Sequence, residues 1–542
     1  MKSHDLVYKN VDVFNVFTGH MDHGDLAVDK GVIVGLGDYQ GRKELDGTGR
    51  TIVPGFIDGH IHLESSMLTP DRFAEAVAPH GTCAVITDPH EIANVCGTAG
   101  IDYMLEATTD LPIDVYFMVP SCVPASPFDE NGYTIAADQI RDYMSNARVL
   151  GLAEMMNYPG VLASDPETMS KIAVAHAAGK LVDGHAPGLT GEDLRQYVAA
   201  GIYSDHECTT AEEALEKLGM GQWIMVREGT AGKNLQALLP LCQEPYFHRC
   251  MFATDDKHPD DLINTGHIDY IIRRAIELGV RPQVAYQMAT INAATYFKLA
   301  GYGAVAPGYR ANFVVLRDFK TVDVEVVYKD GVPVAEINCS GTAAASSICD
   351  TMRLKPVTAA DFAIDGSAKV IGLVPGEVLT TDEGWADGVD VAADVLKLAV
   401  VERHHETGHI GRCYVKGYGL KSGAVATSVA HDSHNVICVG TNDDDMATAV
   451  MALRDMRGGL VIVDGGRVVA SMALSIAGLM CDLPVVQATE ALEAVRGAAH
   501  SLGVREDIDP FMTLSFASLP VIPALKLTTL GVVDVVAFKL LD

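Results

Sequence analysis

Eight short apolar segments rich in β-forming residues recur about every 25–30 residues through the middle of the chain, separated by helix-like stretches. Alternating strands and helices predict parallel strands joined by crossover helices. Eight such strands in about 250 residues is the count of a closed (β/α)8 barrel. The sequence therefore predicts an α/β protein built on a TIM-type barrel. The predicted strands are 52–58, 84–87, 115–119, 149–153, 180–183, 202–204, 223–226 and 250–253.

Two further regions flank this barrel, as expected of 542 residues, which are too many for one hydrophobic core. Short strands and tight turns before the barrel resemble a stretch after it, and together they predict a small composite β domain of residues 1–51 and 305–344. The barrel then takes residues 52–304. Residues 345–542 mix helices and strands and predict a third, α/β or α+β domain. Its predicted helices are 394–403, 444–457 and 489–502, and its predicted strands include 459–463 and 467–470.

The charge and cysteine content exclude several classes of function. A formal net charge of −31, from 71 acidic and 40 basic residues, argues against nucleic-acid and anionic-membrane partners. No apolar run reaches the roughly 18 residues of a membrane-spanning helix, and the start of the chain lacks an apolar signal core. Eleven cysteines without a Cys-x-x-Cys pair are typical of reduced thiols. We therefore expect a cytoplasmic protein that acts on a small molecule. We also expect a homo-oligomer such as a dimer, since large acidic barrel proteins often bury apolar helix faces between subunits.

The first predicted strand ends in two histidines separated by one residue, His60 and His62. Residues two apart in an extended strand point to the same side, so both imidazoles can approach one metal ion. Neutral imidazole is a good ligand for zinc, iron or manganese. Barrels of this type place their chemistry at the carboxyl ends of the strands. The other strand ends carry suitable residues there: Asp88, His90, Glu91, Glu154, His185, Asp205, His206, Glu207, Arg227, Glu228, Asp255 and Asp256.

Six of these strand-end residues are potential metal ligands that together can hold two divalent ions, with one carboxylate between them. They are His60, His62, Glu154, His185, His206 and Asp255. Two cations lower the pKa of a water molecule towards neutrality, and a nearby carboxylate takes its proton as it attacks. This pattern indicates metal-assisted hydrolysis. Asp256 competes with Asp255 for the ligand position, because one sequence does not show which of the two faces inward.

The stretch from Pro54 to His62 resembles the first-strand motif of the amidohydrolase superfamily, with Pro-Gly-Phe-Ile-Asp-x-His-x-His. Longer strings resemble the bacterial adenine deaminases of that superfamily, from about residue 50 to the end of the chain. These strings are 62–67, 87–95, 151–157, 183–188, 204–208, 254–259, 429–435 and 509–516.

This resemblance implies the hydrolysis of adenine to hypoxanthine and ammonia in purine salvage, at a binuclear manganese, iron or zinc centre. It implies that His60 and His62 bind the more buried ion, that His185 and His206 bind the other, and that Glu154 bridges the two. It also implies that Asp255 binds metal and moves a proton from the attacking water to the leaving ammonia. Hydantoinase-like relatives have a modified lysine in the bridging place, so the glutamate favours the deaminase branch.

Deamination at C6 of a purine also needs a proton on N1 as negative charge develops there. His90 and Glu91, on the loop after the second strand, are the candidates for substrate contact and N1 protonation. Glu64, Ser65 and Arg227 are expected to shape the substrate pocket or to orient the histidines.

Two alternative functions remain open. The same metal site could hydrolyse a different cyclic amide, an imide or another aminopurine, since a fold alone never fixes the substrate. A barrel kept as a scaffold without catalysis is the second, and the full set of six ligands disfavours it.

Other histidines in the third region also allow two interpretations. His405 and His409 match the His-Glu-x-x-His pattern of metalloproteases, which works on a helix. Gly408 lies within the pattern and residues 414–417 resemble a strand and turn, so we expect a surface or interface role instead. His431 and His434 are either ordinary loop residues or residues by which the third domain contacts the mouth of the barrel.

Overall fold

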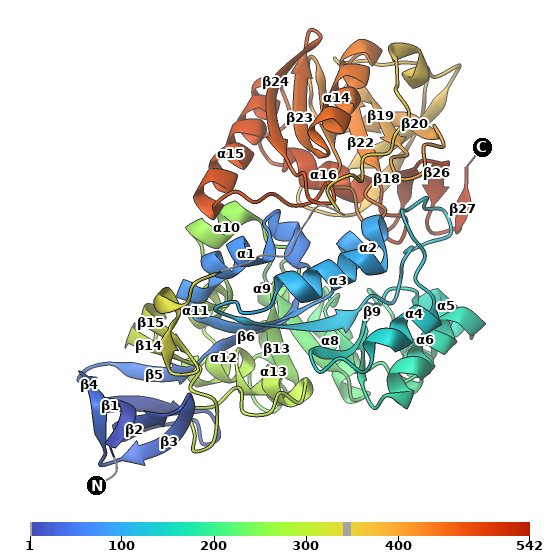
Figure 1. Cartoon of the computed structure of the whole chain (residues 1–542). Helices are drawn as coiled ribbons and strands as arrows, with labels where there is room; N and C mark the ends of the chain where they lie inside the picture. The colour runs from blue at the N-terminus through green and yellow to red at the C-terminus, as the bar shows by residue number, and fades with distance from the viewer. Residues whose placement is uncertain (1–2, 340–347, 542) are drawn as a thin grey trace.

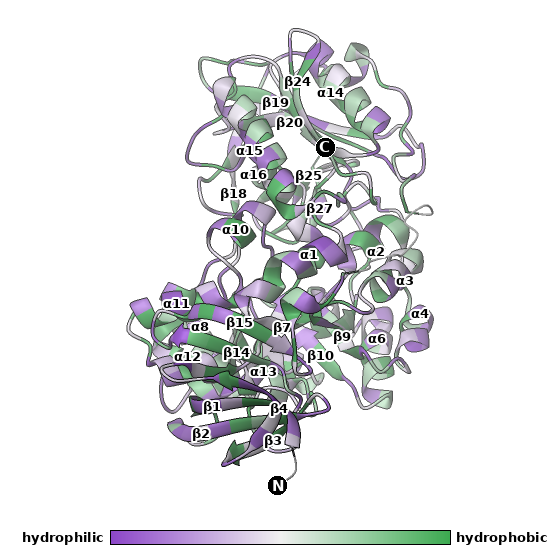
Figure 2. Cartoon of the chain, turned by 60° about the vertical axis from the view of Figure 1, so that its left-hand side comes forward, coloured by the Kyte–Doolittle hydropathy of each residue, from purple (hydrophilic) through white to green (hydrophobic). Residues whose placement is uncertain are grey.

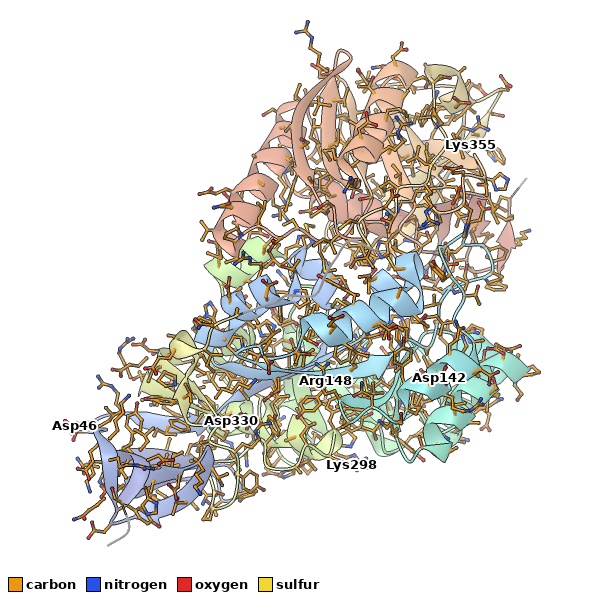
Figure 3. The ribbon with its side chains drawn as sticks, in the orientation of Figure 1. Asp46, Asp142, Arg148, Lys298, Asp330 and Lys355 are labelled. Carbon is orange, nitrogen blue, oxygen red and sulfur yellow. The ribbon has the colours of Figure 1, made fainter. Side chains whose placement is uncertain are left out.

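The computed structural model describes residues 3–339 and 348–541, and it places a barrel between a small β sheet and a C-terminal α/β region (Figure 1). Within the described residues, no helix is both long and apolar enough to cross a membrane. Charged side chains such as Asp46, Asp142 and Lys298 lie on the outside of the molecule (Figure 3).

The barrel strands are parallel and close into a ring, as predicted. Hydrogen bonds join the five consecutive strands from β6 through β10 into one sheet, and the three strands from β11 through β13 into another. A parallel bridge between Ile61 and Asp255 joins the last strand to the first, and Tyr203 donates to the Val182 carbonyl (3.4 Å) between β10 and β11. The strands are β6 (Phe56–Ile61), β7 (Thr82–Thr87), β8 (Asp114–Val119), β9 (Val149–Met155), β10 (Leu181–Gly184), β11 (Ser204–Asp205), β12 (Trp223–Arg227) and β13 (Cys250–Ala253).

The first predicted strand, 52–58, is divided in the structure. Its first half is β5 (Thr51–Pro54), which pairs with β1 and β14 outside the barrel, and the barrel strand begins at Phe56. Pro54 has no N–H to donate to a ladder, so it ends one strand before the next begins.

An apolar plug fills the barrel beneath the strand ends. Ile57, Ile86, Met118, Met225 and Met251 belong to one cluster of buried side chains there. The polar residues that the sequence marks as potential ligands lie at the carboxyl ends of the strands instead.

Some of the helices that surround the barrel begin at side-chain caps. The Asp165 side chain accepts from the Thr168 N–H at the start of α6, and Thr210 accepts from the Glu213 N–H at the start of α8. The helices are α1 (Pro70–Val77), α2 (His90–Cys96), α3 (Thr98–Ala107), α4 (Ala137–Tyr143), α5 (Tyr158–Leu162), α6 (Pro166–Ala177), α7 (Gly191–Ala199), α8 (Ala211–Gly219), α9 (Leu235–Leu238), α10 (Pro259–Asn264), α11 (Ile268–Glu277), α12 (Pro282–Met288) and α13 (Ile291–Tyr296).

One eight-stranded sheet is built from residues on both sides of the barrel. Its β5 pairs with β1 on one side and with β14 on the other, so the start of the chain meets the segment that follows the barrel. Hydrophobic and hydrophilic residues are interleaved along β1 and β2 (Figure 2). The strands are β1 (Ser3–Asn15), β2 (His20–Asp29), β3 (Val32–Gly37), β4 (Gln40–Asp46), β5, β14 (Phe313–Asp318), β15 (Asp323–Lys329) and β16 (Val332–Pro333). The predicted domain limit at residues 344–345 lies outside the described residues.

The C-terminal region contains a second eight-stranded sheet, in the order β18-β17-β20-β19-β22-β21-β23-β24. Its strands are β17 (Ala368–Leu373), β18 (Thr380–Ala386), β19 (Val395–Val401), β20 (Ile410–Lys416), β21 (Ala424–Thr427), β22 (Val436–Gly440), β23 (Gly459–Asp464) and β24 (Arg467–Ala473). The helices α14 (Asp443–Met456), α15 (Val485–Ser501) and α16 (Pro510–Ala517) accompany it, with a small sheet of β25 (Leu525–Thr528), β26 (Gly531–Asp534) and β27 (Lys539–Leu540).

One predicted helix in this region is wrong. Residues 394–403 contain the strand β19, which lies between β20 and β22 and is buried on both faces. A strand covered on both faces is apolar almost throughout, so it lacks the alternation that distinguishes a strand from a helix. The predicted helices 444–457 and 489–502 and the predicted strands 459–463 and 467–470 are confirmed as α14, α15, β23 and β24.

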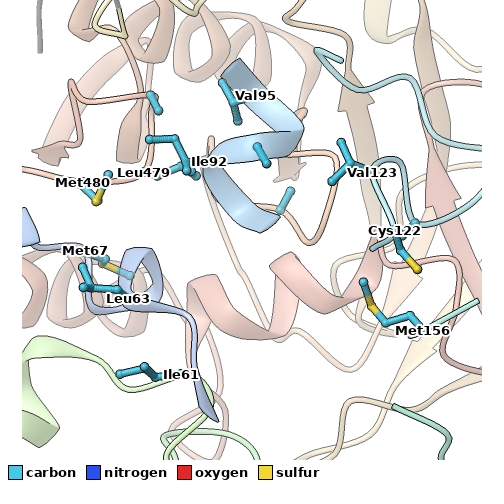
Figure 4. Packing of buried hydrophobic residues seen from close by; sticks show 14 of the residues in the cluster. Ile61, Leu63, Met67, Ile92, Val95, Cys122, Val123, Met156, Leu479 and Met480 are labelled. Carbon is cyan, nitrogen blue, oxygen red and sulfur yellow. The ribbon is translucent and has the colours of Figure 1, made fainter. Parts of the chain in front are cut away.

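The C-terminal region covers the mouth of the barrel. Cys481 exchanges backbone hydrogen bonds with the barrel loop, to the Met67 carbonyl (2.9 Å) and from the Thr69 N–H (3.1 Å). Leu479 and Met480 belong to the same buried cluster as Met67 and Ile92 of the barrel (Figure 4). The carboxyl ends of the strands are therefore enclosed between the two regions.

We predict that Lys217→Met destabilises the barrel by about 3–5 kcal/mol, the usual cost of removing one partner of a buried ion pair. The Lys217 ammonium is fully buried and lies 2.8 Å from Glu213 Oε1, 3.2 Å from Asp205 Oδ2 and 2.7 Å from the Ala186 carbonyl. Urea unfolding followed by fluorescence measures the change. The exposed Lys298→Met serves as the control, and equal midpoints for the two variants would contradict the prediction.

Candidate metal centre

Six side chains converge at the carboxyl end of the barrel. His60 lies in β6 and Glu154 in β9. His62, His185 and His206 each directly follow a barrel strand, and Asp255 follows β13 after one residue, Thr254. All but His185 are buried, and His185 is half-buried. The structure thus brings together all six residues that the sequence marks as potential ligands.

Three of the six, His60, His62 and Asp255, form a group with one oxygen of Glu154. His60 Nε2 lies 3.2 Å from His62 Nε2, and these two atoms lie 3.7 Å and 3.1 Å from Asp255 Oδ1. Glu154 Oε1 completes this group, 3.8 Å from His60 Nε2 and 3.2 Å from His62 Nε2.

The other oxygen of Glu154 faces a second pair of histidines. Glu154 Oε2 lies 2.7 Å from His185 Nδ1 and 3.2 Å from His206 Nε2. The two imidazole nitrogens are 3.3 Å apart. Glu154 therefore offers one oxygen to each histidine pair, which is the arrangement of a bridging carboxylate.

This donor set fits divalent cations. Ligand atoms at about 2.0–2.2 Å from one metal ion lie roughly 3–3.5 Å from each other, close to the spacing within both groups. Three ligand atoms of His60, His62 and Asp255 lie within 4.8 Å of one another, as do those of His60, Glu154 and His206. Imidazole with carboxylate suits zinc, iron and manganese. Although burial opposes its charge, the neighbouring His206 and His185 hold the pKa of Glu154 well below its usual range.

The backbone and buried carboxylates orient the first two histidines. His62 Nδ1 lies 3.0 Å from the Asp88 carbonyl, so Nδ1 carries the proton and Nε2 presents its lone pair to the cluster. The Asp58 carboxylate accepts from the backbone N–H groups of His60 (3.2 Å) and Thr254 (3.1 Å), which ties β6 to the end of β13.

Asp255 and Asp256 face different partners. Asp255 directs Oδ1 to the histidines and accepts a hydrogen bond from Arg227 on Oδ2. Asp256 accepts from the Ser65 hydroxyl (2.5 Å). Although burial opposes the charge, Arg227 and His62 hold the pKa of Asp255 well below its usual range, whereas burial and Asp255 raise that of Asp256.

The remaining predicted pocket residues surround this centre. Arg227 also donates to Glu207 Oε2 (3.0 Å) and lines the cavity at the cluster. Glu64 accepts from the Ile92 N–H on Oε1 (3.1 Å), and burial raises the pKa of Glu64 to about 7.

His90 and Glu91 lie at the start of α2, beside the cluster. His90 Nδ1 is 3.0 Å from Asp88 Oδ2 and 3.4 Å from Glu154 Oε1, and its Nε2 is 3.4 Å from Glu91 Oε1. His90 therefore lies between the bridging carboxylate and Glu91.

Two histidines of the C-terminal region, His431 and His434, contact Glu91 of the barrel. This agrees with the interpretation in which these histidines extend into the barrel mouth. His431 Nδ1 lies 2.7 Å from Glu91 Oε1, and His434 Nε2 contacts Glu91 Oε2. His434 Nδ1 accepts from the Ala430 N–H (3.2 Å), so the proton of His434 is on Nε2 and is donated to Glu91. The only sequence signal for this contact is the polar loop 431–435 itself.

The His-Glu-x-x-His pattern at 405–409 does not form a metal site. Its residues are not helical, and the two imidazoles separate to different partners. His405 Nε2 lies 2.9 Å from the Asn131 carbonyl, and His409 Nδ1 lies 2.8 Å from Glu130 Oε1. Both contacts join the C-terminal region to the barrel loop after β8.

Two adjoining cavities open at the centre and share Glu91 and His431. The larger, of about 530 Å³, is lined by every ligand side chain except His60, by His90, Asp256 and Arg227, and by Asp432, Phe516, Leu519 and Ile522 of the C-terminal region. The second, of about 460 Å³, is lined by Glu64 and Ser65 and by apolar residues such as Leu479 and Phe511. Both regions of the chain therefore form the walls around the cluster.

A barrel with four histidines and two carboxylates at its strand ends defines a metal-dependent hydrolase, and the amidohydrolase family model matches residues 51–334. The model of the adenine deaminase C-terminal domain matches residues 377–539. Adenine deaminase 2 of Carboxydothermus hydrogenoformans is 48% identical over 99% of this chain and 96% of its own length. The adenine deaminases of Dehalococcoides mccartyi (strain 195) and Oceanobacillus iheyensis are 47% and 46% identical over 99% of this chain, and over 96% and 95% of their own lengths. The chain therefore belongs to the adenine deaminase family of the amidohydrolases.

Proposed function

We propose that the protein catalyses the hydrolytic deamination of adenine in purine salvage, in which adenine and water give hypoxanthine and ammonia. The observation that carries this proposal is the two-sided Glu154 cluster, which is enclosed by a region matching the adenine deaminase C-terminal domain.

His60, His62 and Asp255 would hold one divalent ion, and His185 and His206 the other, with Glu154 between them. Manganese, iron and zinc all suit this donor set. Bound ions of this kind supply the Lewis acidity that makes water a competent nucleophile near neutral pH. The Asp88 carbonyl and the Asp58 carboxylate keep His60 and His62 in place for this role.

Asp255 would accept a proton from the water that attacks C6 and deliver it to the amino group, which departs as ammonia. Its Oδ1 faces the histidines, and the Arg227 guanidinium on Oδ2 keeps the carboxyl ionised before the attack. Asp256, held by Ser65, would lie beside this path and shape the pocket.

N1 of the purine gains a proton from a side chain of the protein during the same reaction. The second proton of the attacking water then restores the proton of that side chain. His90 and Glu91 are the proposed donors to N1, and Glu91 has His431 beside it. Although burial opposes the charge, Glu91 raises the pKa of His431 to about 9, so this pair holds a proton at neutral pH. Glu64, Ser65 and Arg227 remain the proposed wall of the pocket.

An ammonia-release assay on the purified, manganese-supplemented protein tests the function. Adenine is expected to give hypoxanthine and ammonia in equal amounts, read by absorbance change and mass. A panel of other aminopurines, pyrimidines, cyclic amides and imides separates the alternative substrates from adenine. A protein that binds two metal ions and releases no ammonia from adenine would refute the proposal.

We predict that Glu91→Gln lowers kcat by about 10²–10³-fold, within the usual contribution of a positioned acid–base group. KM for adenine should change much less, because the amide keeps the shape of the side chain. Steady-state kinetics at several pH values measures both. Glu130→Gln is the control, since Glu130 pairs with His409 at the same interface and does not line the cavities. Equal kcat for Glu91→Gln and the native protein would rule out this role.

We also propose that the protein is cytoplasmic, that it forms a homo-oligomer such as a dimer, and that it has no nucleic-acid or membrane partners. The free cysteines support the cytoplasmic location, and the net charge of −31 supports the lack of nucleic-acid and membrane partners. The shared sheet of β1–β5 and β14–β16 supports the composite β domain, with the barrel from 52 to 304 and the C-terminal domain from 345.

A further inference from the structure

Lys526 is a fully buried lysine in β25, one contact away from the wall that the C-terminal region contributes to the larger cavity. Its Nζ donates to two backbone carbonyls, those of Val378 (2.8 Å) and Phe516 (2.8 Å). Both of these residues line the larger cavity, whereas Lys526 itself does not. The lysine therefore joins two segments of the cavity wall that are far apart in the sequence.

A buried lysine without a carboxylate partner is uncommon, because burying an unpaired ammonium is unfavourable. No carboxylate pairs with Lys526 in the described parts of the chain, and burial lowers its pKa to about 7. The amine has at least two N–H donors with or without its third proton, so both carbonyls keep their partner on either side of this pKa. Methionine would have a similar length and avoid the cost of burial, so folding alone does not explain a lysine here.

The contact with Phe516 holds the carboxyl end of α16. Phe516 is the penultimate residue of that helix, where carbonyl groups lack helical partners and a cation is favoured. At the other end, the Asp509 side chain caps the helix by accepting from two backbone N–H groups. Arg496 links Asp509 (2.6 Å) to Asp260 of the barrel (2.6 Å). Polar contacts therefore fix α16 at both ends.

The helix fixed in this way supports His431, which pairs with Glu91. Ser515 Oγ accepts from the His431 N–H (3.1 Å). The Phe516 ring is stacked on the imidazole of His431, with centroids 4.8 Å apart and an angle of 22° between the rings. His431 Nδ1 lies 2.7 Å from Glu91 Oε1. A displacement of the helix end would therefore alter the cavity wall beside the proposed N1 donor.

We propose that Lys526 is a positioning residue for the deamination: by holding the Val378 and Phe516 carbonyls together, it keeps the Phe516 ring in place as a wall against which the purine packs. This inference rests on the proposed function. Aromatic side chains favour contact with a flat aromatic ligand, and a wall already in place costs less on binding than one that must first be ordered. Because Lys526 does not line the cavity, it acts through Phe516.

Lys526→Met is expected to raise KM for adenine about 3- to 10-fold, the usual worth of one aromatic contact. The value of kcat should change much less, because His431 keeps its own contact with Glu91. Lys526→Arg keeps donors for the carbonyls, and its KM should lie closer to the native value. Lys355→Met is the matched control, since the exposed Lys355 (Figure 3) also donates to a backbone carbonyl of this region, that of Thr407 (2.9 Å), and lines neither cavity. Its KM should equal that of the native protein.

A double-mutant cycle shows whether Lys526 acts through Phe516. In a Phe516→Leu background the ring is absent, so Lys526→Met should raise KM much less there than in the native background. Thermal unfolding checks that each variant is folded. Lys526→Gln, whose shorter side chain does not span the two carbonyls, replaces the Met variant if that one does not fold. Equal effects in both backgrounds, or an unchanged KM in the folded variant, would overturn the proposal.

A crystal structure of Lys526→Met tests the positioning directly and needs no substrate. The Phe516 ring is expected to leave its stacked position on His431, and a stack identical to that of the native protein would overturn the proposal. A native protein inactive on adenine would instead refute the proposed function, and the structural comparison would still decide whether Lys526 positions the wall.

Discussion

Asp255→Asn is expected to lower kcat by about 10³–10⁴-fold, near the upper end of what a positioned proton-transfer group contributes. The amide keeps the volume of the side chain and its contact with Arg227, but it neither accepts a proton at neutral pH nor carries the charge that a cation attracts. Asp255 Oδ1 lies 3.1 Å from His62 Nε2, so the loss occurs at the cluster itself. Steady-state kinetics with adenine, together with the metal content per chain, measures the effect.

Asp256→Asn is the matched control for this prediction, because the neighbouring residue has the same side chain. Asp256 bonds to Ser65 rather than to the cluster, and a loss of about tenfold or less is expected from one weakened hydrogen bond. A larger loss in Asp256→Asn than in Asp255→Asn would reverse the roles that the geometry supports.

The barrel and its six strand-end residues could be predicted from the sequence because both follow from periodicity. Regularly spaced apolar segments predict parallel strands, and parallel strands bring their carboxyl ends to one side. His60, His62, Glu154, His185 and His206 needed no further information to be placed together. The first strand limit was harder to place, since Pro54 separates two strands that read as one apolar run.

The choice between Asp255 and Asp256 depended on backbone geometry, which the sequence does not reveal. Asp255 has a positive φ of 61°, a conformation uncommon for residues other than glycine. In a regular strand, neighbouring residues such as Asp255 and Asp256 point to opposite sides. That rule separates the two carboxyls but does not show which of them faces the histidines. The contact to the cluster is made by Asp255.

The contribution of the C-terminal region could not be predicted for a different reason. His431 and His434 are separated from Glu91 by more than 300 residues, and no periodic pattern connects the two segments. Their contact depends on how one folded region packs on another, through side chains such as Leu479 and Ile92. The helix predicted at 394–403 failed for a related reason, because a strand buried on both faces gives no alternating signal.

Removing the metal ions is expected to abolish deamination, with a residual rate below roughly one thousandth of the native rate, because the activated nucleophile is lost. Dialysis against a chelator should achieve this, and adding back manganese, iron or zinc separately should restore activity to different extents. The same treatment should lower the midpoint of thermal unfolding, because ions that bind only the folded chain stabilise it. Elemental analysis of each reconstituted sample identifies which ion supports the highest kcat.

Glu154→Gln tests the same site by changing a side chain that is proposed to bind the ions, rather than by removing the ions. Glu154 gives one oxygen to each histidine pair, so the loss of its charge should weaken the binding of both ions together rather than one alone. Elemental analysis should therefore show a joint decrease, with kcat falling in proportion to the fraction of chains that keep both ions. Glu228→Gln is the matched control, since Glu228 is a buried glutamate near the barrel mouth that does not line the cavity of the cluster. A Glu154→Gln protein that keeps one ion tightly and loses the other would show that the carboxylate serves a single ion, and the bridging arrangement would then be wrong.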